Sequence, residues 1–544
     1  MFRRLFRAIA AVGRVTRSIR VALAESQQYL VPTLVAVLMT GASVSAQAPV
    51  PVSDERPVSL EARVRLLEAE LAAARQSLRA LTPVAPTAVD APAPTATTPE
   101  PASVVSAPAA GRADSTEAAL AAIEERLDAL DQQIRVAQRL AELERDKAIE
   151  EAKAAPRVTA GREGFSLQSA DRAFQLKLRG YTQADGRFYT SERTSGMADT
   201  FVMRRVRPVL EGTLFGTVDF RIMPDFGEGR TVLQDAYADL RFTPAVKLRA
   251  GKFKSPFGLE RLVSATDLLF VDRALPTALV PNRDVGVMLF GDVAATTIAY
   301  ALGVFNGVPD GGSADIDDSP GKDVIARVFV SPFKNNKTSR IQQFGVGLAA
   351  SVGEREGTTA APGLPTFRTT SQQTFARYRT DGVNTVIADG THWRVSPQAQ
   401  FYLASFGAIT EYVFSSQNVR QGTAQDTVQN RAWQVSTSYV LTGELASPRI
   451  VPRRALDPKS GGWGAVELTA RYHTLELDKD FLARWSTAAI GVEWARAWDT
   501  GVNWYLNRGV KLTAEYQEVR FRGGATDGDR PTERGVLTRV QVGF

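Results

Sequence analysis

Apolar positions repeat with two different periods along the chain. In the segments 60–81 and 120–141, apolar residues are spaced alternately four and three positions apart, which places one narrow seam along a helix. The seam positions are Leu60, Val64, Leu67, Leu71, Ala74, Leu78 and Leu81 in the first segment, and Leu120, Ile123, Leu127, Leu130, Ile134, Ala137 and Ala141 in the second. A helix with so narrow an apolar seam buries little apolar surface by itself, so we expect it to self-associate as a coiled coil. The alternative is a solitary helical spacer.

From about residue 172 the period becomes two. In FQLKLRGYTQADGRFY, which starts at Phe174, apolar and polar residues alternate, and the same pattern recurs in LQDAYADLRF, AVELTARYH and VKLTAEYQEV. This period indicates β-strands with one apolar and one polar face. Such strands form either a soluble sandwich, whose apolar faces meet in a core, or a transmembrane barrel, whose apolar faces meet lipid.

Strand lengths and connections favour the barrel. The strands are about 10 residues long, and short turns such as 215–217, 243–244 and 507–509 alternate with long polar loops. Barrels inserted from the periplasm have short turns on one side and long loops on the other. The alternating closing stretch ends on Phe544, which we interpret as an outer-membrane assembly signal. The sequence predicts an all-β transmembrane barrel of about 16 antiparallel strands, a number that leaves an aqueous lumen.

The N-terminus predicts export. Six arginines precede residue 21, an apolar run covers 29–42, and small residues follow at 43–46, as in a signal peptide. Pro32 and the shortness of the apolar run argue against a transmembrane anchor, which needs about 20 apolar residues. We therefore expect a signal peptide at 1–46, a periplasmic coiled-coil region at 47–160 with a Pro/Ala/Thr-rich linker at 82–116, and a barrel at 161–544 in the cell outer membrane.

Composition narrows the chemistry. Cysteine is absent, only His392 and His473 are present as histidines, and the net charge is +6. These counts exclude disulfides and thiolate chemistry and leave little room for a histidine metal site, so we expect no cofactor and no metal. The acidic segment that begins at Asp310 lacks the ligand spacing of a calcium loop, and we expect a solvated loop. No basic tract indicates nucleic acid as a partner. An outer-membrane barrel enzyme is disfavoured because neither histidine lies in a recognisable catalytic motif.

Six segments resemble the phosphate-selective porins of the O and P type. They are RRVRPVLEGTLFGTVDFRIMPDF from Arg204, GKFKSPFGLERL from Gly251, YALGVFNG from Tyr300, YVLTGE from Tyr439, WGAVELTARY from Trp463 and GVNWYLNRGVKLTAEY from Gly501. The resemblance covers about 164–544, and its segments agree in order and spacing. It implies a sixteen-stranded barrel, a homotrimer, and an anion-preferring pore that is narrowed by inward loops and lined by an arginine ladder with lysines at the constriction.

Cations recur on the polar faces of the predicted strands. In the lipid at mid-bilayer each would cost roughly 2–4 kcal/mol, so we expect them in the lumen. The candidate pore-lining residues are Lys177, Arg179, Arg187, Arg205, Arg207, Arg241, Lys247, Arg249, Arg327, Arg394, Arg471, Lys511 and Arg539. Carboxylates on the same faces offer the alternative of simple charge balance; they are Asp185, Glu211, Asp235, Asp239, Glu467 and Glu515. Arg204 has the opposite, lipid-facing parity, which suggests a subunit interface or a headgroup contact.

The segment 251–292 is too long and irregular for a hairpin, and its length and position are those of a porin constriction loop. Its cationic residues are the constriction candidates Lys252, Lys254, Arg261, Arg273 and Arg283. The alternative is a segment that only packs against the wall and buttresses it.

The sequence thus predicts an outer-membrane porin, a water-filled channel for small solutes that prefers anions, with selectivity for phosphate or polyphosphate as the finer hypothesis. Its expected partners are small anions such as phosphate, outer-membrane lipid and two further copies of the chain. The alternative function is a structural envelope tether, in which the coiled coil reaches peptidoglycan and the barrel is an anchor.

Overall fold

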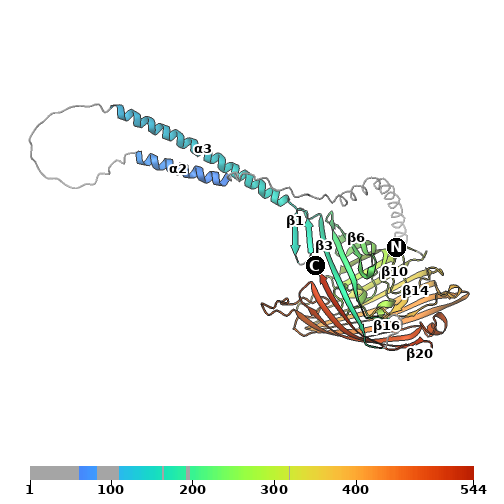
Figure 1. Cartoon of the computed structure of the whole chain (residues 1–544). Helices are drawn as coiled ribbons and strands as arrows, with labels where there is room; N and C mark the ends of the chain where they lie inside the picture. The colour runs from blue at the N-terminus through green and yellow to red at the C-terminus, as the bar shows by residue number, and fades with distance from the viewer. Residues whose placement is uncertain (1–59, 82–109, 162–163, 192–196, 318) are drawn as a thin grey trace, which may run out of the picture. The chain divides into compact units, whose positions relative to one another are not determined.

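The computed structural model describes residues 60–81, 110–161, 164–191, 197–317 and 319–544 (Figure 1). The expected signal peptide and most of the expected linker lie outside these residues. The chain divides into two compact units, Met1–Asp146 and Lys147–Phe544. No helix in the described part of the chain is both long enough and apolar enough to cross a membrane.

The first unit contains one whole helix and most of a second, and these pack against each other. They are α2 (Leu60–Leu81) and α3 (Ala110–Ala154). Leu71 of α2 and Ile134 of α3, both predicted seam residues, are 8% and 7% exposed. Glu68 accepts a hydrogen bond from Gln138, and Arg75 forms an ion pair with Asp131. Because residue numbers rise along one helix as they fall along the other, the pairing is antiparallel, and the two predicted seams meet within one chain. Association between chains stays a prediction.

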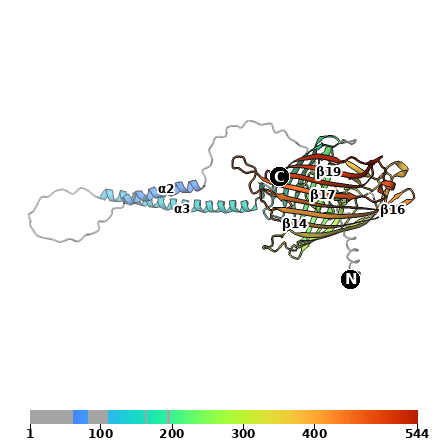
Figure 2. The same ribbon diagram turned by 90° about the horizontal axis from the view of Figure 1, so that it is seen from below.

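Sixteen antiparallel strands form a closed barrel (Figures 1 and 2). The strands are β3 (Gln175–Tyr189), β4 (Thr200–Leu214), β5 (Val218–Asp225), β6 (Val232–Thr243), β7 (Val246–Lys254), β8 (Arg283–Val293), β9 (Ile298–Phe305), β10 (Asp323–Val330), β11 (Gly345–Glu356), β14 (Ile387–Leu403), β15 (Phe406–Gln421), β16 (Ala424–Val440), β17 (Ala465–Glu476), β18 (Val492–Tyr505), β19 (Val510–Ala525) and β21 (Glu533–Gly543). Each pairs with the next, and β21 pairs with β3 to close the cylinder. The predicted strand number and antiparallel order are confirmed.

Successive residues of each strand face opposite sides of the barrel wall. On β16, Trp433 and Val435 point outward and are 38% and 41% exposed, whereas Gln434 and Ser436 point inward and are each 1% exposed. The outer face can therefore meet hydrocarbon while the polar face meets the interior.

Shorter elements lie outside the cylinder's main ladder. Strand β1 (Arg157–Gly161) pairs with β2 (Gly164–Gln168), which pairs with the start of β3. A hairpin of β12 (Thr366–Arg368) and β13 (Thr374–Arg377) forms a separate sheet, and β20 (Gly528–Asp529) pairs antiparallel with the end of β19. The short helices are η1 (Gly227–Gly229), α4 (Leu259–Leu262), η2 (Leu275–Leu279), η3 (Gly382–Asn384) and η4 (Phe481–Trp485).

The connections follow the predicted alternation with exceptions. At the barrel end that holds Phe544, most turns are short, but the connections 331–344 and 441–464 are long. At the opposite end most loops are long, yet β15 and β16 are joined by a two-residue hairpin in which Gly422 has φ 58°. The length of a single connection therefore does not show at which end of the barrel it lies.

The segment 255–282, which we call the lumen loop, leaves β7, crosses the interior and returns to β8. Three of its backbone N–H groups donate to side chains of the opposite wall: Leu259 to Glu411 (2.7 Å), Val271 to Glu515 (2.7 Å) and Leu275 to Nδ1 of His473 (3.1 Å). Its apolar residues Phe257 and Leu279 are fully buried. The lumen loop is thus fixed at several points across the barrel.

Candidate pore and lumen loop

A cavity of about 1110 Å³ lies in the barrel beside the lumen loop. Twelve cationic residues border it: Arg204, Arg205, Arg207, Arg221, Arg230, Arg249, Lys254, Arg261, Arg273, Arg283, Arg327 and Arg368. Six carboxylates do so: Asp225, Glu228, Asp235, Asp272, Asp292 and Asp310. The excess of positive charge makes the lining favourable for anions.

The predicted site residues divide into three groups. Those on this cavity are Arg205, Arg207, Arg249 and Arg327 from the wall, and Lys254, Arg261, Arg273 and Arg283 from the lumen loop and its ends. Arg179 and Lys511 border a second cavity of about 270 Å³ near Phe544. The residues that border neither cavity are Lys177, Arg187, Arg241, Lys247, Lys252, Arg394, Arg471 and Arg539.

Several predicted wall arginines are paired with carboxylates. Arg394 contacts Asp310 at 2.6 Å, and Arg539 contacts Asp185 at 2.6 Å and 2.7 Å. Arg394 and Arg539 are 1% and 3% exposed, so their charges are compensated and covered. On the cavity itself, Arg249 forms a two-pronged pair with Asp239 at 2.7 Å and 2.8 Å. For these residues the geometry is that of charge balance.

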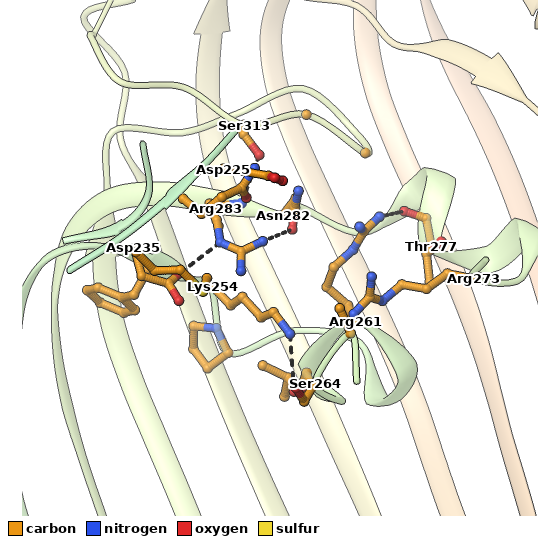
Figure 3. Close-up of a pocket in the computed structure, with 18 of the residues that line it drawn as sticks. Asp225, Asp235, Lys254, Arg261, Ser264, Arg273, Thr277, Asn282, Arg283 and Ser313 are labelled. Atoms are coloured by element: carbon orange, nitrogen blue, oxygen red, sulfur yellow. Dashed lines mark hydrogen bonds and ion pairs between the residues drawn. The ribbon is translucent and has the colours of Figure 1, made fainter. Parts of the chain in front are cut away.

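Another group of cations lacks this compensation (Figure 3). Lys254 Nζ donates to the carbonyl oxygen of Val263 (2.8 Å), Arg261 Nη2 to that of Thr277 (2.5 Å), and Arg273 Nη2 to that of Val263 (2.8 Å). Within the described residues, none of these three forms an ion pair with a carboxylate. Arg283, which does pair with Asp235 (2.7 Å), lies beside them. We call Lys254, Arg261, Arg273 and Arg283 the cation cluster.

The surroundings of Arg261 destabilise the charged form of its guanidinium group. Burial, together with the charges of Arg273 and Arg283, lowers the pKa of Arg261 to about 9. Its Nε is buried and makes no hydrogen bond with any described residue. An anion in the cavity would relieve the like-charge repulsion among these cations.

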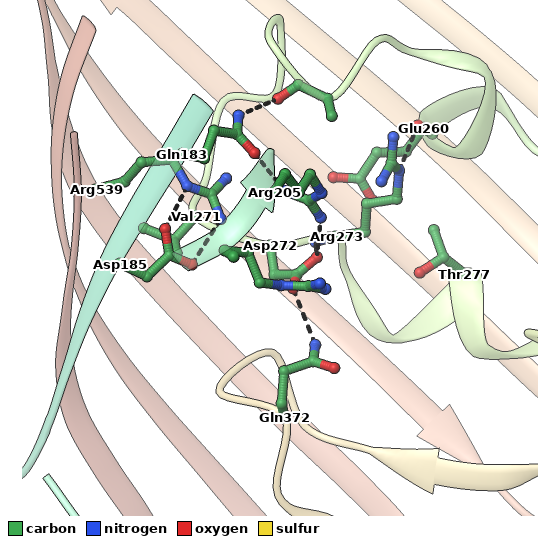
Figure 4. A network of polar contacts seen from close by, with 12 residues as sticks. Gln183, Asp185, Arg205, Glu260, Val271, Asp272, Arg273, Thr277, Gln372 and Arg539 are labelled. Atoms are coloured by element: carbon green, nitrogen blue, oxygen red, sulfur yellow. Dashed lines mark hydrogen bonds and ion pairs between the residues drawn. The ribbon is translucent and has the colours of Figure 1, made fainter. Parts of the chain in front are cut away.

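A β-bulge adds a neighbouring arginine pair (Figure 4). Gln183 pairs with Arg205 but Ala184 pairs with Met203, so Arg204 has no partner on β3. The extra residue breaks the alternation of side chains. Arg204 therefore points inward and pairs with Asp272 of the lumen loop at 2.9 Å. The lipid-facing interpretation of Arg204 is wrong for this reason.

Asp272 is held by these arginines. Burial alone would raise its pKa, but the charges of Arg204 and Arg205 hold the pKa of Asp272 well below its ordinary value. Its carboxylate is therefore ionised across the physiological range. The carboxylate and the arginines together form a compact charged cluster on the wall of the cavity.

The sequence did not reveal that three other connections also enter the barrel. Asp310, expected in a solvated loop, is 6% exposed because Arg394 and Ser415 of the wall bind its carboxylate. Ser371, in the loop 357–386, donates to Glu533 on β21. At the Phe544 end, Ile450 of the connection 441–464 packs against the wall and borders the second cavity. The polar composition of these segments carried no sign of their burial.

A closed barrel with an apolar outer face and a polar, cavity-bearing interior is the architecture of an outer-membrane β-barrel protein, the class that includes the porins. The chain belongs to the phosphate-selective porin O and P family, whose model matches residues 174–544. It is similar to Porin O of Pseudomonas aeruginosa, with 25% identity over 423 residues that cover 70% of this chain and 91% of that protein. The protein is an outer-membrane porin that forms a channel.

Solved structures give a more distant likeness. An anion-selective porin from Comamonas acidovorans matches with TM-score 0.44 and 10% identity, covering 68% of this chain and 100% of that one. OmpT, an outer membrane protein of Vibrio cholerae, matches with TM-score 0.43 and 10% identity, covering 68% of this chain and 98% of that one.

Proposed function

We propose that this porin prefers anions and that the cation cluster sets the preference. The observation that carries the proposal is the absence of carboxylate partners for Lys254, Arg261 and Arg273 within the described residues, on a cavity wall where most other cations are paired. Uncompensated charge in a confined, water-filled space raises the local concentration of anions and lowers that of cations.

Phosphate is the anion that this chemistry suits best. A guanidinium group donates two parallel hydrogen bonds to neighbouring oxygens of one oxyanion, which chloride cannot accept in that form. Several cations along one wall would bind phosphate in succession, and conduction requires that no single site hold it too tightly. The family description, phosphate-selective porin, agrees with this hypothesis.

Planar-bilayer recording tests both levels of the proposal. Under a potassium chloride gradient, the reversal potential should show preference for chloride over potassium. Phosphate added to symmetrical chloride should reduce the chloride current in a saturable manner. A cation-preferring channel would refute the anion proposal, whereas anion preference without block by phosphate would refute only the phosphate hypothesis.

The working form of the porin is proposed to be a homotrimer, with residues 47–160 in the periplasm. The helices α2 and α3 precede the barrel, and α3 carries many charged residues outside its seam. Native mass spectrometry of detergent-solubilised protein tests the trimer. Deleting residues 53–155 tests the tether alternative: envelope defects with normal conductance would support a peptidoglycan contact, and unchanged envelopes would exclude it.

A further inference from the structure

The carboxylate of Asp272 occupies a site with the coordination of a bound oxyanion (Figure 4). Its Oδ2 accepts hydrogen bonds from Arg204 Nη2 (2.9 Å), Arg204 Nε (3.3 Å) and Gln372 Nε2 (2.9 Å). Its Oδ1 accepts from the backbone N–H of Arg273 (2.9 Å) and from Arg205 Nη2 (3.5 Å). Two guanidinium groups, one amide and one backbone N–H form a donor set that would serve a free carboxylate or phosphate equally well.

This site lies on the permeation cavity. Arg204, Arg205, Asp272 and Gln372 border the same cavity as the cation cluster, and Asp272 precedes Arg273 of that cluster in the chain. An anion that leaves the cluster therefore finds two more arginines next to it, already occupied by a group of the protein.

The lumen loop has anchors to the barrel wall besides Asp272. The same loop is anchored through Leu259, Val271 and Leu275 to residues of three different strands of the opposite wall. Loss of one charged contact among several leaves the others, and neighbouring backbone hydrogen bonds keep the segment positioned. The charge of Asp272 therefore has a role that can be separated from anchoring.

We propose that Asp272 is a tethered competitor that occupies the Arg204–Arg205 anion site and so limits how tightly the pore holds a permeating oxyanion. This inference rests on the proposed anion function and adds a residue that tunes it. A covalently attached carboxylate competes at an effective concentration in the millimolar range or above, which a passing anion must match to displace it. While Asp272 occupies the Arg204–Arg205 site, a permeating oxyanion binds there only weakly, as rapid conduction requires.

The test is phosphate block of chloride current by Asp272→Asn. Asparagine has nearly the same shape but no charge, so the arginine pair keeps only Glu228, which pairs with Arg204 at 3.1 Å. The half-blocking phosphate concentration should therefore fall about tenfold, equivalent to about 1.4 kcal/mol. Asp272→Ser should act in the same direction, and it provides a second measurement if the first variant folds poorly. The double variant Arg204→Gln with Asp272→Asn should return toward the wild-type value, because one guanidinium of the exposed pair is gone.

Asp225→Asn is the matched control. Asp225 borders the same cavity and pairs with Arg207 at 2.7 Å, so this variant changes the cavity charge by the same amount at a different place. Equal shifts in both variants, or no shift in Asp272→Asn, would overturn the inference. Weaker block with noisier current would also overturn it, because Asp272 would then be a loop anchor. If wild type lacks anion preference, the proposed function fails before this comparison is made.

Discussion

Arg261→Gln should weaken anion preference without reversing it. Arg261 borders the cavity, has no carboxylate partner among the described residues, and donates only to the carbonyl oxygen of Thr277. Glutamine can keep a donor for that carbonyl while it removes the charge. The remaining cations of the cluster, Lys254, Arg273 and Arg283, continue to favour anions.

The size of the effect follows from Coulomb's law. Two unit charges 4 Å apart interact by about 1 kcal/mol in bulk water and by about 4 kcal/mol at an effective dielectric constant of 20. A water-filled lumen lies toward the first limit, so we expect a loss of about 1–2 kcal/mol for an anion beside residue 261. For the anion alone that corresponds to a decrease of about 5-fold to 30-fold, since 1.4 kcal/mol is a factor of about 10. The same change in potential favours the cation, so the anion-to-cation permeability ratio should fall by at least this factor.

Reversal potentials under a potassium chloride gradient measure this ratio directly. Arg340→Gln is the control, because Arg340 is an exposed arginine in the connection 331–344 and borders neither cavity. Its removal should leave the reversal potential unchanged. If Arg261→Gln also leaves it unchanged, or if both variants shift it equally, the cation cluster does not set the selectivity.

Three further predictions concern binding and the lumen loop. Phosphate should stabilise the detergent-solubilised porin against unfolding by about 2.7 kcal/mol at a concentration 100 times the dissociation constant, and so raise its thermal unfolding temperature. Calorimetry in phosphate and in matched chloride measures this rise. An equal rise in Arg261→Gln would contradict the prediction. His473→Phe should increase open-channel noise in single-channel records, because His473 accepts from Leu275 of the lumen loop, whereas His473→Gln, which can accept and donate, should stay quiet. Arg539→Gln should destabilise the barrel by about 3–5 kcal/mol because Asp185 is left buried without its partner; a denaturant titration with no such loss would refute the role of this pair in closing the barrel.

Much of the fold could be predicted because its physical signal is local. A strand between lipid and water must alternate, so the outward Trp433 and inward Gln434 are distinguishable in the sequence itself. The helical seams were equally local, and Leu71 and Ile134 are buried as their spacing predicts. Their mutual partnership within one chain was not predictable, because a seam does not specify which other seam it meets.

The site was harder to predict because its determinants are not local. Alternation places Arg204 outward, and only the pairing register of β3 with β4 contains the bulge that turns it inward. Whether an arginine is free or neutralised depends on residues far away in the sequence: Arg394 meets Asp310 across 84 positions, while Arg261 meets no carboxylate in the described structure. Counting cations on strand faces finds candidates but cannot separate these two cases.

The pairing of β3 with β21, which closes the barrel, affects how the chain folds. Asp185 on β3 and Arg539 on β21 form an ion pair across this junction and are 354 positions apart. The edge of β3 that pairs with β21 therefore stays unpaired until the last strand of the chain is available. Contacts of such long range form late and slowly. Until β21 pairs with it, this edge of β3 exposes unpaired backbone groups that can pair with the wrong strand.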